Sequence, residues 1–279
     1  MDVRDAHRLD EPATQVPASR TIFEVADLCI GFGDREDILR DVTMKVRAGE
    51  FVTLLGPSGC GKTTILNLAG GLIRPRSGHV RFEGQPIEGF NTSAGYMTQD
   101  DTLLPWRTVA ANIGLPLRLR GVPKAEIKSK VDSYLRMLDL EHARALFPGQ
   151  LSGGMRRRAL LARSMIYEPT LLLMDEPFAA LDAQMRQQMH VELRETVTRL
   201  NQAVLFVTHD IAEAAALSDR VLVVGGGPPG GIVADVELPF GSDRDLATLR
   251  FEKEFFEVER ELHDILLTAK LRASSARER

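Results

Sequence analysis

The chain has 279 residues, of which 44% are hydrophobic and 27% are charged, and its formal net charge is −4. These values are typical of a globular protein with one large domain, or with a core and an inserted subdomain, and they exclude binding to nucleic acid or anionic lipid through net charge. Two cysteines, Cys29 and Cys60, give no disulfide framework, and no stretch reaches the roughly 18 apolar residues of a membrane span.

Residues 1–20 form a polar segment with two prolines and no apolar periodicity. We therefore expect a flexible tail, with ordered structure beginning near Ile22. The segment also lacks the apolar run of a secretory signal, so the sequence predicts a cytosolic protein.

Residues 50–72, EFVTLLGPSGCGKTTILNLAGGL, combine a short apolar strand, a glycine-rich loop and an apolar helix. This order is typical of an α/β nucleotide-binding core. The loop has the spacing G-x-x-x-x-G-K-T, in which backbone N–H groups face phosphate oxygens, the lysine reaches the β and γ phosphates and the threonine ligates magnesium. A glycine turn that merely joins strand to helix is the alternative. The residues expected to bind nucleotide are Gly56, Pro57, Ser58, Gly59, Cys60, Gly61, Lys62, Thr63 and Thr64.

A helical region is expected between this unit and the later strands. From Pro123 onward, apolar residues fall on one helical face, namely Ile127, Val131, Leu135 and Leu138. Apolar strands then resume, with an amphipathic helix between the first two of them. The strands are expected at residues 170–175, 203–209 and 220–225, and the helix at 183–200. Continuous apolar strands that alternate with helices predict a parallel sheet buried on both faces.

Two acidic residues end the first of these strands, in LLLMDEP. Asp175 is placed to hold a magnesium ion beside the phosphate loop, and Glu176 to activate water as a general base. The alternative is that both acids cap the helix that follows. His209 follows the next strand at the same position. A lone histidine there is more often structural, so its role depends on the phosphate loop.

Five motifs in this order, GPSGCGKT, LSGG, LLLMDE, ALD and VTHD, resemble those of the nucleotide-binding subunit of ATP-binding cassette (ABC) transporters. The resemblance extends from about residue 25 to residue 236. It implies an α/β fold with a P-loop NTPase core and a mostly parallel sheet, an antiparallel β subdomain near the N-terminus and a helical subdomain inserted at about 100–165. The expected organisation is a tail at 1–20, an ATPase domain at 21–236 and a C-terminal helical extension at 237–279.

The resemblance also implies a site shared between two subunits that meet head to tail. ATP on the phosphate loop of one chain is covered by the LSGG turn of the other, through Ser152, Gly153 and Gly154, and hydrolysis weakens this joint. The implied cofactors are ATP and Mg²⁺. The implied metal ligands are Thr63, Asp175 and Gln99, and the catalytic residues are Glu176, His209 and Gln99. Phe32 is implied to stack on adenine, and Asp182 to contact the opposite subunit.

Two features depart from the usual family pattern. Met155 stands where glutamine is usual, and a thioether cannot donate the hydrogen bond that glutamine would. Methionine there, together with the segment 100–117, resembles importers of the nitrate, sulfonate, taurine and bicarbonate group. The run Arg156–Arg158 stands where an arginine–glutamine–arginine run is usual. We expect these arginines to form a solvated face or to support the field of the triphosphate, and we expect no nucleic acid partner.

The segment LLPW, residues 103–106, lies just after Gln99, where subunits of the family receive a short cytoplasmic helix of the membrane partner. Packing inside the helical subdomain is the open alternative for Leu103 and Leu104. Trp106 is expected to dock the partner or to line its groove.

An apolar helical stripe is expected near the C-terminus, made of Phe251, Phe255, Val258, Leu262 and Ile265. Packing on the chain's own core is the expected use, and a dimer contact is the alternative.

The function that the resemblance implies is ATP hydrolysis that powers an importer of a small anionic solute. The implied partners are a second copy or a homologous ATPase subunit, two membrane-spanning permease subunits and, indirectly, a solute-binding protein. The chain would lie on the cytoplasmic face of the cell membrane. One alternative is a soluble cassette ATPase of DNA repair, translation or cluster assembly, which usually carries a long insertion or two cassettes. A regulatory module that binds nucleotide without hydrolysis is another, and intact Lys62, Glu176 and His209 disfavour it.

Overall fold

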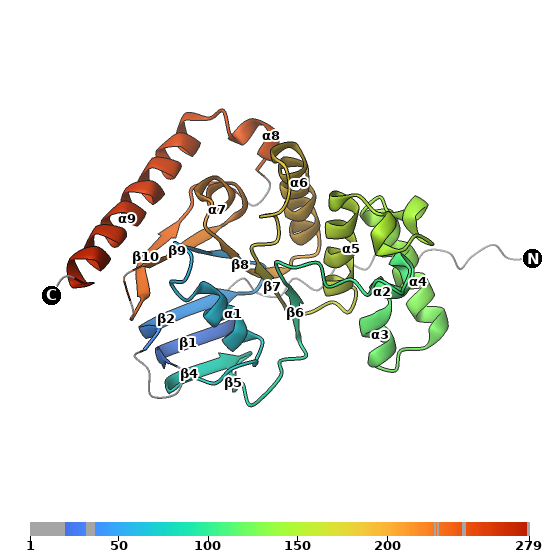
Figure 1. Cartoon of the computed structure of the whole chain (residues 1–279), viewed down its shortest axis with the longest axis horizontal. Coiled ribbons are helices and arrows are strands. Elements are labelled where there is room, and N and C mark those ends of the chain that lie inside the picture. The colour runs from blue at the N-terminus through green and yellow to red at the C-terminus, as the bar shows by residue number, and fades with distance from the viewer. Residues whose placement is uncertain (1–19, 32–36, 226, 228, 242–243, 278–279) are drawn as a thin grey trace, which may run out of the picture.

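The computed structural model describes residues 20–31, 37–225, 227, 229–241 and 244–277. The predictions for residues 1–19 and for Phe32 fall outside this part of the chain. Figure 1 shows strands at the centre, a group of helices on one side and a long C-terminal helix on the opposite side.

An antiparallel sheet lies in the N-terminal part, with the strand order β2-β1-β4-β5. Along β2, the buried Val42, Met44 and Val46 alternate with exposed residues, which is the pattern of a strand with one face on a core. The strands are β1 (Thr21–Ile30), β2 (Leu39–Arg47), β4 (Ser77–Phe82) and β5 (Gln85–Pro86). The predicted antiparallel β subdomain is therefore confirmed.

The second sheet has the order β10-β9-β3-β8-β7-β6. Its strands are β3 (Phe51–Leu55), β6 (Ala94–Met97), β7 (Leu171–Asp175), β8 (Ala203–Thr208), β9 (Arg220–Gly225) and β10 (Gly231–Glu237). All neighbours pair in parallel except β10, which lies antiparallel to β9 at the edge. The mostly parallel sheet predicted from the apolar runs is confirmed.

Both faces of this second sheet are buried. In β8, Leu205 and Val207 belong to a core that also contains the antiparallel sheet and helix α1 (Lys62–Ala69). Val204 and Phe206 of the same strand face a second core, which the remaining helices share. Because successive side chains point to opposite faces, burial of both faces requires an uninterrupted apolar strand.

The helices α2 to α5 form the group at one side of the molecule (Figure 1). They are α2 (Val109–Ile113), α3 (Leu115–Leu119), α4 (Lys124–Met137) and α5 (Gly153–Met165), with short 3₁₀ turns at Glu141–Ala143 and Pro148–Gln150. Val131 and Leu135 of the predicted face of α4 are buried, with Leu138 just after the helix, and Ile127 is half-buried. Leu103 is buried in the same core as Val131 and Leu135, so it packs inside the helical subdomain. Leu104 is half-buried.

The last helices cover the second sheet from the side opposite to α1. They are α6 (Ala183–Arg199), α7 (Ile211–Leu217), α8 (Leu246–Leu249) and α9 (Lys253–Arg277). Helix α9 packs on α7 and β9, which confirms packing on the chain's own core. Within the described residues, no helix is both long enough and apolar enough to span a bilayer.

The predicted stripe on this C-terminal helix is wrong at its first residue. Phe251 is 83% exposed because α9 begins only at Lys253. Ile265 is half-buried and packs against the core, and its neighbour Leu266 is buried in it. With 3.6 residues per turn, Leu266 lies nearer than Ile265 to the line through Phe255 and Leu262, which explains its deeper burial.

Candidate functional site

Three neighbouring strands bring the predicted site residues to one edge of the second sheet. The glycine-rich loop follows β3, Asp175 ends β7, and His209 follows β8, which lies between these two strands. Because the strands are parallel, their carboxyl ends meet at the same edge, which is where open α/β sheets bind ligands.

The glycine-rich loop, residues 56–64, has a backbone that only glycine allows at two positions. Gly61 has a φ of 102°, in the left-handed region, directly before α1 begins. A Cβ on Gly56 would lie 2.3 Å from the carbonyl oxygen of Val224. The start of α1 has no side-chain cap and no acidic residue in its first turn. Its free N–H groups and positive dipole end therefore suit a phosphate.

Lys62 lies in this loop as a buried cation. Its Nζ donates to the carbonyl oxygens of Gly56 and Pro57, at 2.8 and 2.9 Å. These bonds fold the ammonium over the loop that would hold the phosphates. Cys60 fills space beneath the loop, and burial raises the pKa of its thiol although the charge of Lys62 opposes the shift. The thiol therefore stays protonated and acts as a small apolar side chain.

Thr63 and Asp175 form a pair of oxygen ligands at the same edge. The Thr63 hydroxyl donates to Oδ1 of Asp175 at 3.1 Å. Burial raises the pKa of Asp175, the bond from Thr63 lowers it, and the neighbouring Glu176 raises it again. A divalent cation would relieve this unfavourable environment by favouring the ionised carboxylate. The hydroxyl and carboxylate oxygens are the donor types that Mg²⁺ prefers, so the residues present fit this ion.

Glu176 and His209 are joined across the ends of β7 and β8. Nδ1 of His209 lies 3.0 Å from Oε2 of Glu176. Glu176 has a φ of 42°, and its N–H donates to the carbonyl oxygen of Val207 at 3.0 Å. A glutamate in the left-handed region is strained, and such strain is concentrated at functional sites. We call these two residues the Glu176–His209 pair.

The LSGG turn begins α5 and contacts the start of α6. The Ser152 hydroxyl accepts from the N–H of Met155 at 3.3 Å and so caps α5. Asp182 caps α6 in the same way, through the N–H of Met185 at 2.9 Å. A Cβ on Gly154 would lie 2.4 Å from the sulfur of Met185. The LSGG turn therefore packs against the side chain of Met185, just after the ALD motif, and a side chain at position 154 would require Met185 to shift.

Gln99 is exposed beyond the end of β6, and its backbone is held by the helical subdomain. Arg157 of α5 is only 6% exposed, and its Nη2 donates to the carbonyl oxygen of Gln99 at 2.6 Å. Burial lowers the pKa of Arg157, and Asp101 and Asp100 oppose this shift. The arginine that replaces the usual glutamine thus connects the LSGG helix to the Gln99 loop.

The solvated face predicted for the three arginines is wrong for two of them. Arg157 is buried, and Arg158 is half-buried in a two-pronged ion pair with Glu192 of α6. Arg156 is more exposed, and its Nε lies 3.5 Å from Asp101. The partners come from distant parts of the chain, so the run RRRA gave no sign of them. The one signal in the sequence is that Arg157 stands where glutamine is usual.

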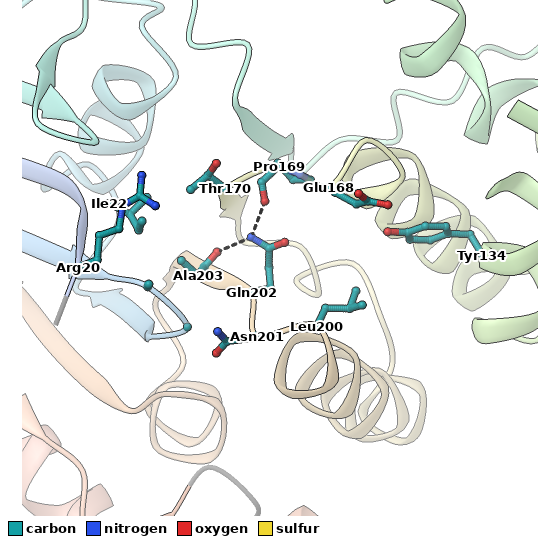
Figure 2. A pocket seen from close by; sticks show the side chains of 12 residues that line it. Arg20, Ile22, Tyr134, Glu168, Pro169, Thr170, Leu200, Asn201, Gln202 and Ala203 are labelled. Carbon is teal, nitrogen blue, oxygen red and sulfur yellow. Dashed lines mark hydrogen bonds between the residues drawn. The ribbon is translucent and has the colours of Figure 1, made fainter. Parts of the chain in front are cut away.

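A hollow of about 350 Å³ lies at the amino ends of β7 and β8, and it contains none of the predicted site residues. Figure 2 shows Arg20 on one side, Tyr134 on the other and Gln202 between them. The Gln202 amide donates to the carbonyl oxygens of Pro169 and Ala203, at 2.9 and 3.1 Å. This hollow is on the edge of the sheet opposite to Lys62, so it is not the nucleotide site.

Sequence comparisons agree with the motifs. A model of the family described as ABC transporter matches residues 39–179. The uncharacterized ABC transporter ATP-binding protein MJ0412 of Methanocaldococcus jannaschii is 40% identical over 234 residues, which cover 84% of this chain and 86% of that protein. The taurine import ATP-binding protein TauB of Chromobacterium violaceum is 42% identical over 208 residues, which cover 75% of this chain and 79% of that protein.

Solved structures agree with the fold. The structure of cbiO1 from Clostridium perfringens, described as part of the ABC transporter complex cbiONQ, has a TM-score of 0.73 at 25% identity. It covers 88% of this chain and 98% of that chain. The dimeric post-hydrolysis state of the ATP-binding cassette MJ0796, bound to ADP and Pi, has a TM-score of 0.67 at 27% identity and covers 79% of this chain and all of that one.

Proposed function

This chain belongs to the ABC transporter family, and from that premise we propose that it hydrolyses ATP to drive an importer of a small anionic solute. The observation that carries the proposal is the meeting of Lys62, the Thr63 and Asp175 oxygens and the Glu176–His209 pair at one edge of the sheet. A phosphate-binding loop, two metal ligands and a base beside them are the parts that phosphoryl transfer to water requires.

The loop would bind the triphosphate. Lys62 would exchange the carbonyl oxygens of Gly56 and Pro57 for the β and γ phosphates, while the first N–H groups of α1 donate to phosphate oxygens. Thr63, Asp175 and Gln99 would hold Mg²⁺, which would neutralise negative charge on the phosphates. Glu176 would accept a proton from the attacking water, and His209 would hydrogen-bond the γ phosphate and hold Glu176 in place.

A second copy of the chain would complete the site. The MJ0796 structure is a dimer, which supports the same assembly here. In a head-to-tail dimer, Ser152, Gly153 and Gly154 would direct a hydroxyl and N–H groups at the phosphates on the partner's loop. Asp182 would contact the opposite subunit beside them. Binding of ATP would then close the dimer, and hydrolysis would loosen it.

Two membrane-spanning permease subunits would receive this motion at the cytoplasmic face of the membrane, and a solute-binding protein would deliver solute to them. Two exposed aromatic side chains support such docking. Trp106 is 71% exposed, and Phe90 is exposed beside an apolar hollow of about 340 Å³ that Leu72 also lines. Large apolar side chains that are exposed on the surface are typical of a binding face.

The choice of a small anionic solute rests on the relatives and on the segment 100–117. TauB proteins of Pseudomonas aeruginosa and Chromobacterium violaceum are named for taurine import, and the chain covers 90% and 79% of their lengths. A spermidine/putrescine import protein, PotA of Pseudomonas aeruginosa, is 40% identical, but the chain covers only 57% of its length. Because the identity to PotA lies within the range of the TauB proteins, the preference for the taurine and sulfonate type rests on Met155 and the segment 100–117.

Removal of this gene is expected to abolish saturable uptake of taurine, whose sulfonate group is ionised, or of a small anion, and a plasmid copy is expected to restore it. The measurement is uptake of radiolabelled taurine, nitrate and bicarbonate by cells with and without the gene. Spermidine uptake serves as the comparison. If no anion uptake changes while survival of DNA damage or translation does, a soluble cassette ATPase becomes the better interpretation.

Trp106→Ala is expected to lower uptake by about 10-fold while leaving the ATPase rate of the isolated subunit within about 2-fold, because the exposed indole would contact only the permease. The same uptake assay and an ATPase assay on purified protein measure the two effects. Phe256→Ala is the matched control, since Phe256 is also exposed but lies on α9. Equal losses of uptake and ATPase activity would contradict a docking role for Trp106.

A further inference from the structure

His190 is a buried polar residue directly behind the catalytic edge. It lies on α6, is 2% exposed, and belongs to the helix that the sequence predicted only as amphipathic. Its ring packs edge-on against Phe178, with ring centroids 5.1 Å apart. Phe178 follows Glu176 by two residues and is fully buried. His190 therefore supports from behind the segment that carries Glu176.

The same imidazole also supports the segment that carries His209. Nε2 of His190 lies 3.3 Å from Oε1 of Glu213, a buried residue of α7. The other oxygen of Glu213 accepts from the hydroxyl of Thr208 at 2.6 Å, and Thr208 directly precedes His209. The Thr208 hydroxyl accepts in turn from the N–H of Asp210 at 3.0 Å. The backbone on both sides of His209 is thus fixed by bonds that lead back to His190.

Glu213 is an ionised acceptor in this network. Burial alone raises the pKa of Glu213, but the hydrogen bonds from His190 and Thr208, together with neighbouring positive charge, outweigh burial, so the pKa lies below its ordinary value. A carboxylate accepts and does not donate, so both neighbours must donate to it. An ionised group left without these donors in the interior would be costly.

The donor requirement selects one tautomer of His190, and Arg250 enforces it. Nη2 of Arg250 lies 3.1 Å from Nδ1 of His190. A guanidinium has only donors, so Nδ1 must accept and the ring hydrogen must be on Nε2, which faces Glu213. Arg250 lies between α8 and α9, in the C-terminal segment. A chain of contacts therefore runs from this segment, through His190, Glu213 and Thr208, to the residue next to His209.

We propose that His190 is a positioning residue that holds the Glu176–His209 pair in its working geometry, and that Arg250 fixes the tautomer with which His190 does so. Packing against Phe178 needs only an apolar side chain, whereas the bonds to Glu213 and Arg250 need a donor on one side of the ring and an acceptor on the other. The C-terminal segment thereby becomes part of the hydrolytic machinery. The inference rests on the proposed roles of Glu176 and His209.

The test compares three variants by the kcat and KM for ATP. His190→Leu removes both polar contacts and is expected to lower kcat by about 10- to 100-fold, because small displacements of catalytic groups have effects of this size, with KM within about 2-fold. His190→Gln keeps a donor and an acceptor and is expected to restore kcat to within about 3-fold of wild type. Arg250 is only half-buried, so Arg250→Ala is expected to fold even if His190→Leu does not. It then tests the same chain of contacts on its own. Arg260→Ala on the exposed side of α9 is its matched control.

A double-mutant cycle separates positioning from general destabilisation. If His190 acts through His209, then His190→Leu or Arg250→Ala is expected to have little further effect on the hydrolysis rate in a His209→Ala background, measured in single turnovers with excess enzyme. The same fractional loss in both backgrounds would overturn the proposal, as would a full kcat for both His190→Leu and Arg250→Ala. If wild-type protein itself does not hydrolyse ATP, the proposed function fails, and that result is distinct from either of these.

Discussion

Glu176→Gln is expected to lower kcat for ATP hydrolysis by about 100- to 10,000-fold, the contribution typical of a general base, while ATP binding remains intact. Glutamine has the shape of glutamate but cannot take a proton from water. It can still hydrogen-bond His209, which lies 3.0 Å from the carboxylate, so the geometry of the edge is expected to survive. With the γ phosphate no longer removed, the variant is expected to form stable dimers in the presence of ATP.

Size-exclusion chromatography with ATP and with ADP measures the dimer, and phosphate release measures turnover. Glu195→Gln is the matched control because it makes the same chemical change at an exposed position of α6. A variant with wild-type turnover would remove Glu176 from the role of base. The left-handed backbone of Glu176, with a φ of 42°, is kept in this comparison because glutamine meets the same steric limits as glutamate.

The glycine-rich loop and the strands that carry the site could be predicted from the sequence, because the residues that form them are close together in the chain. Gly56, Gly61, Lys62 and Thr63 occur within eight residues, and the spacing itself imposes the turn. The apolar runs of β7, β8 and β9 likewise report burial on both faces without reference to any partner. Even the meeting of Asp175 with Thr63 follows once the strands are parallel, because their carboxyl ends must share an edge.

What could not be predicted depends on contacts between distant parts of the chain. Arg157 reaches the carbonyl oxygen of Gln99, which is 58 residues away, and Arg250 reaches His190 across 60 residues. Neither pairing leaves a period or a spacing in the sequence. The prediction of an apolar stripe on α9 is wrong at Phe251 for a related reason. The end of that helix, which leaves Phe251 outside, depends on how the chain leaves α8.

Ser152 combines one observed role with one proposed role. In its own chain, the hydroxyl caps α5 through the N–H of Met155. In a head-to-tail dimer, the same hydroxyl would face the partner's nucleotide. Ser152→Ala would remove both the helix cap and the proposed contact with the nucleotide, and loss of the cap alone costs about 1 kcal/mol of helix stability. Ser152→Asp separates them, because aspartate is an equally good cap and places a negative charge toward the phosphates.

Ser152→Asp and Lys62→Ala are each expected to abolish ATP hydrolysis as pure proteins, and a mixture of the two is expected to regain about a quarter of wild-type activity. In a mixed head-to-tail dimer, one site contains both substitutions and the other contains neither, and about half of the dimers in an equal mixture are mixed. If Ser152 served the nucleotide of its own chain, every site in the mixture would contain one defect. Phosphate release from the mixture at several protein ratios distinguishes these arrangements, since activity should peak at equal amounts. Activity that never exceeds the sum of the separate proteins would mean that the LSGG turn does not act across the interface.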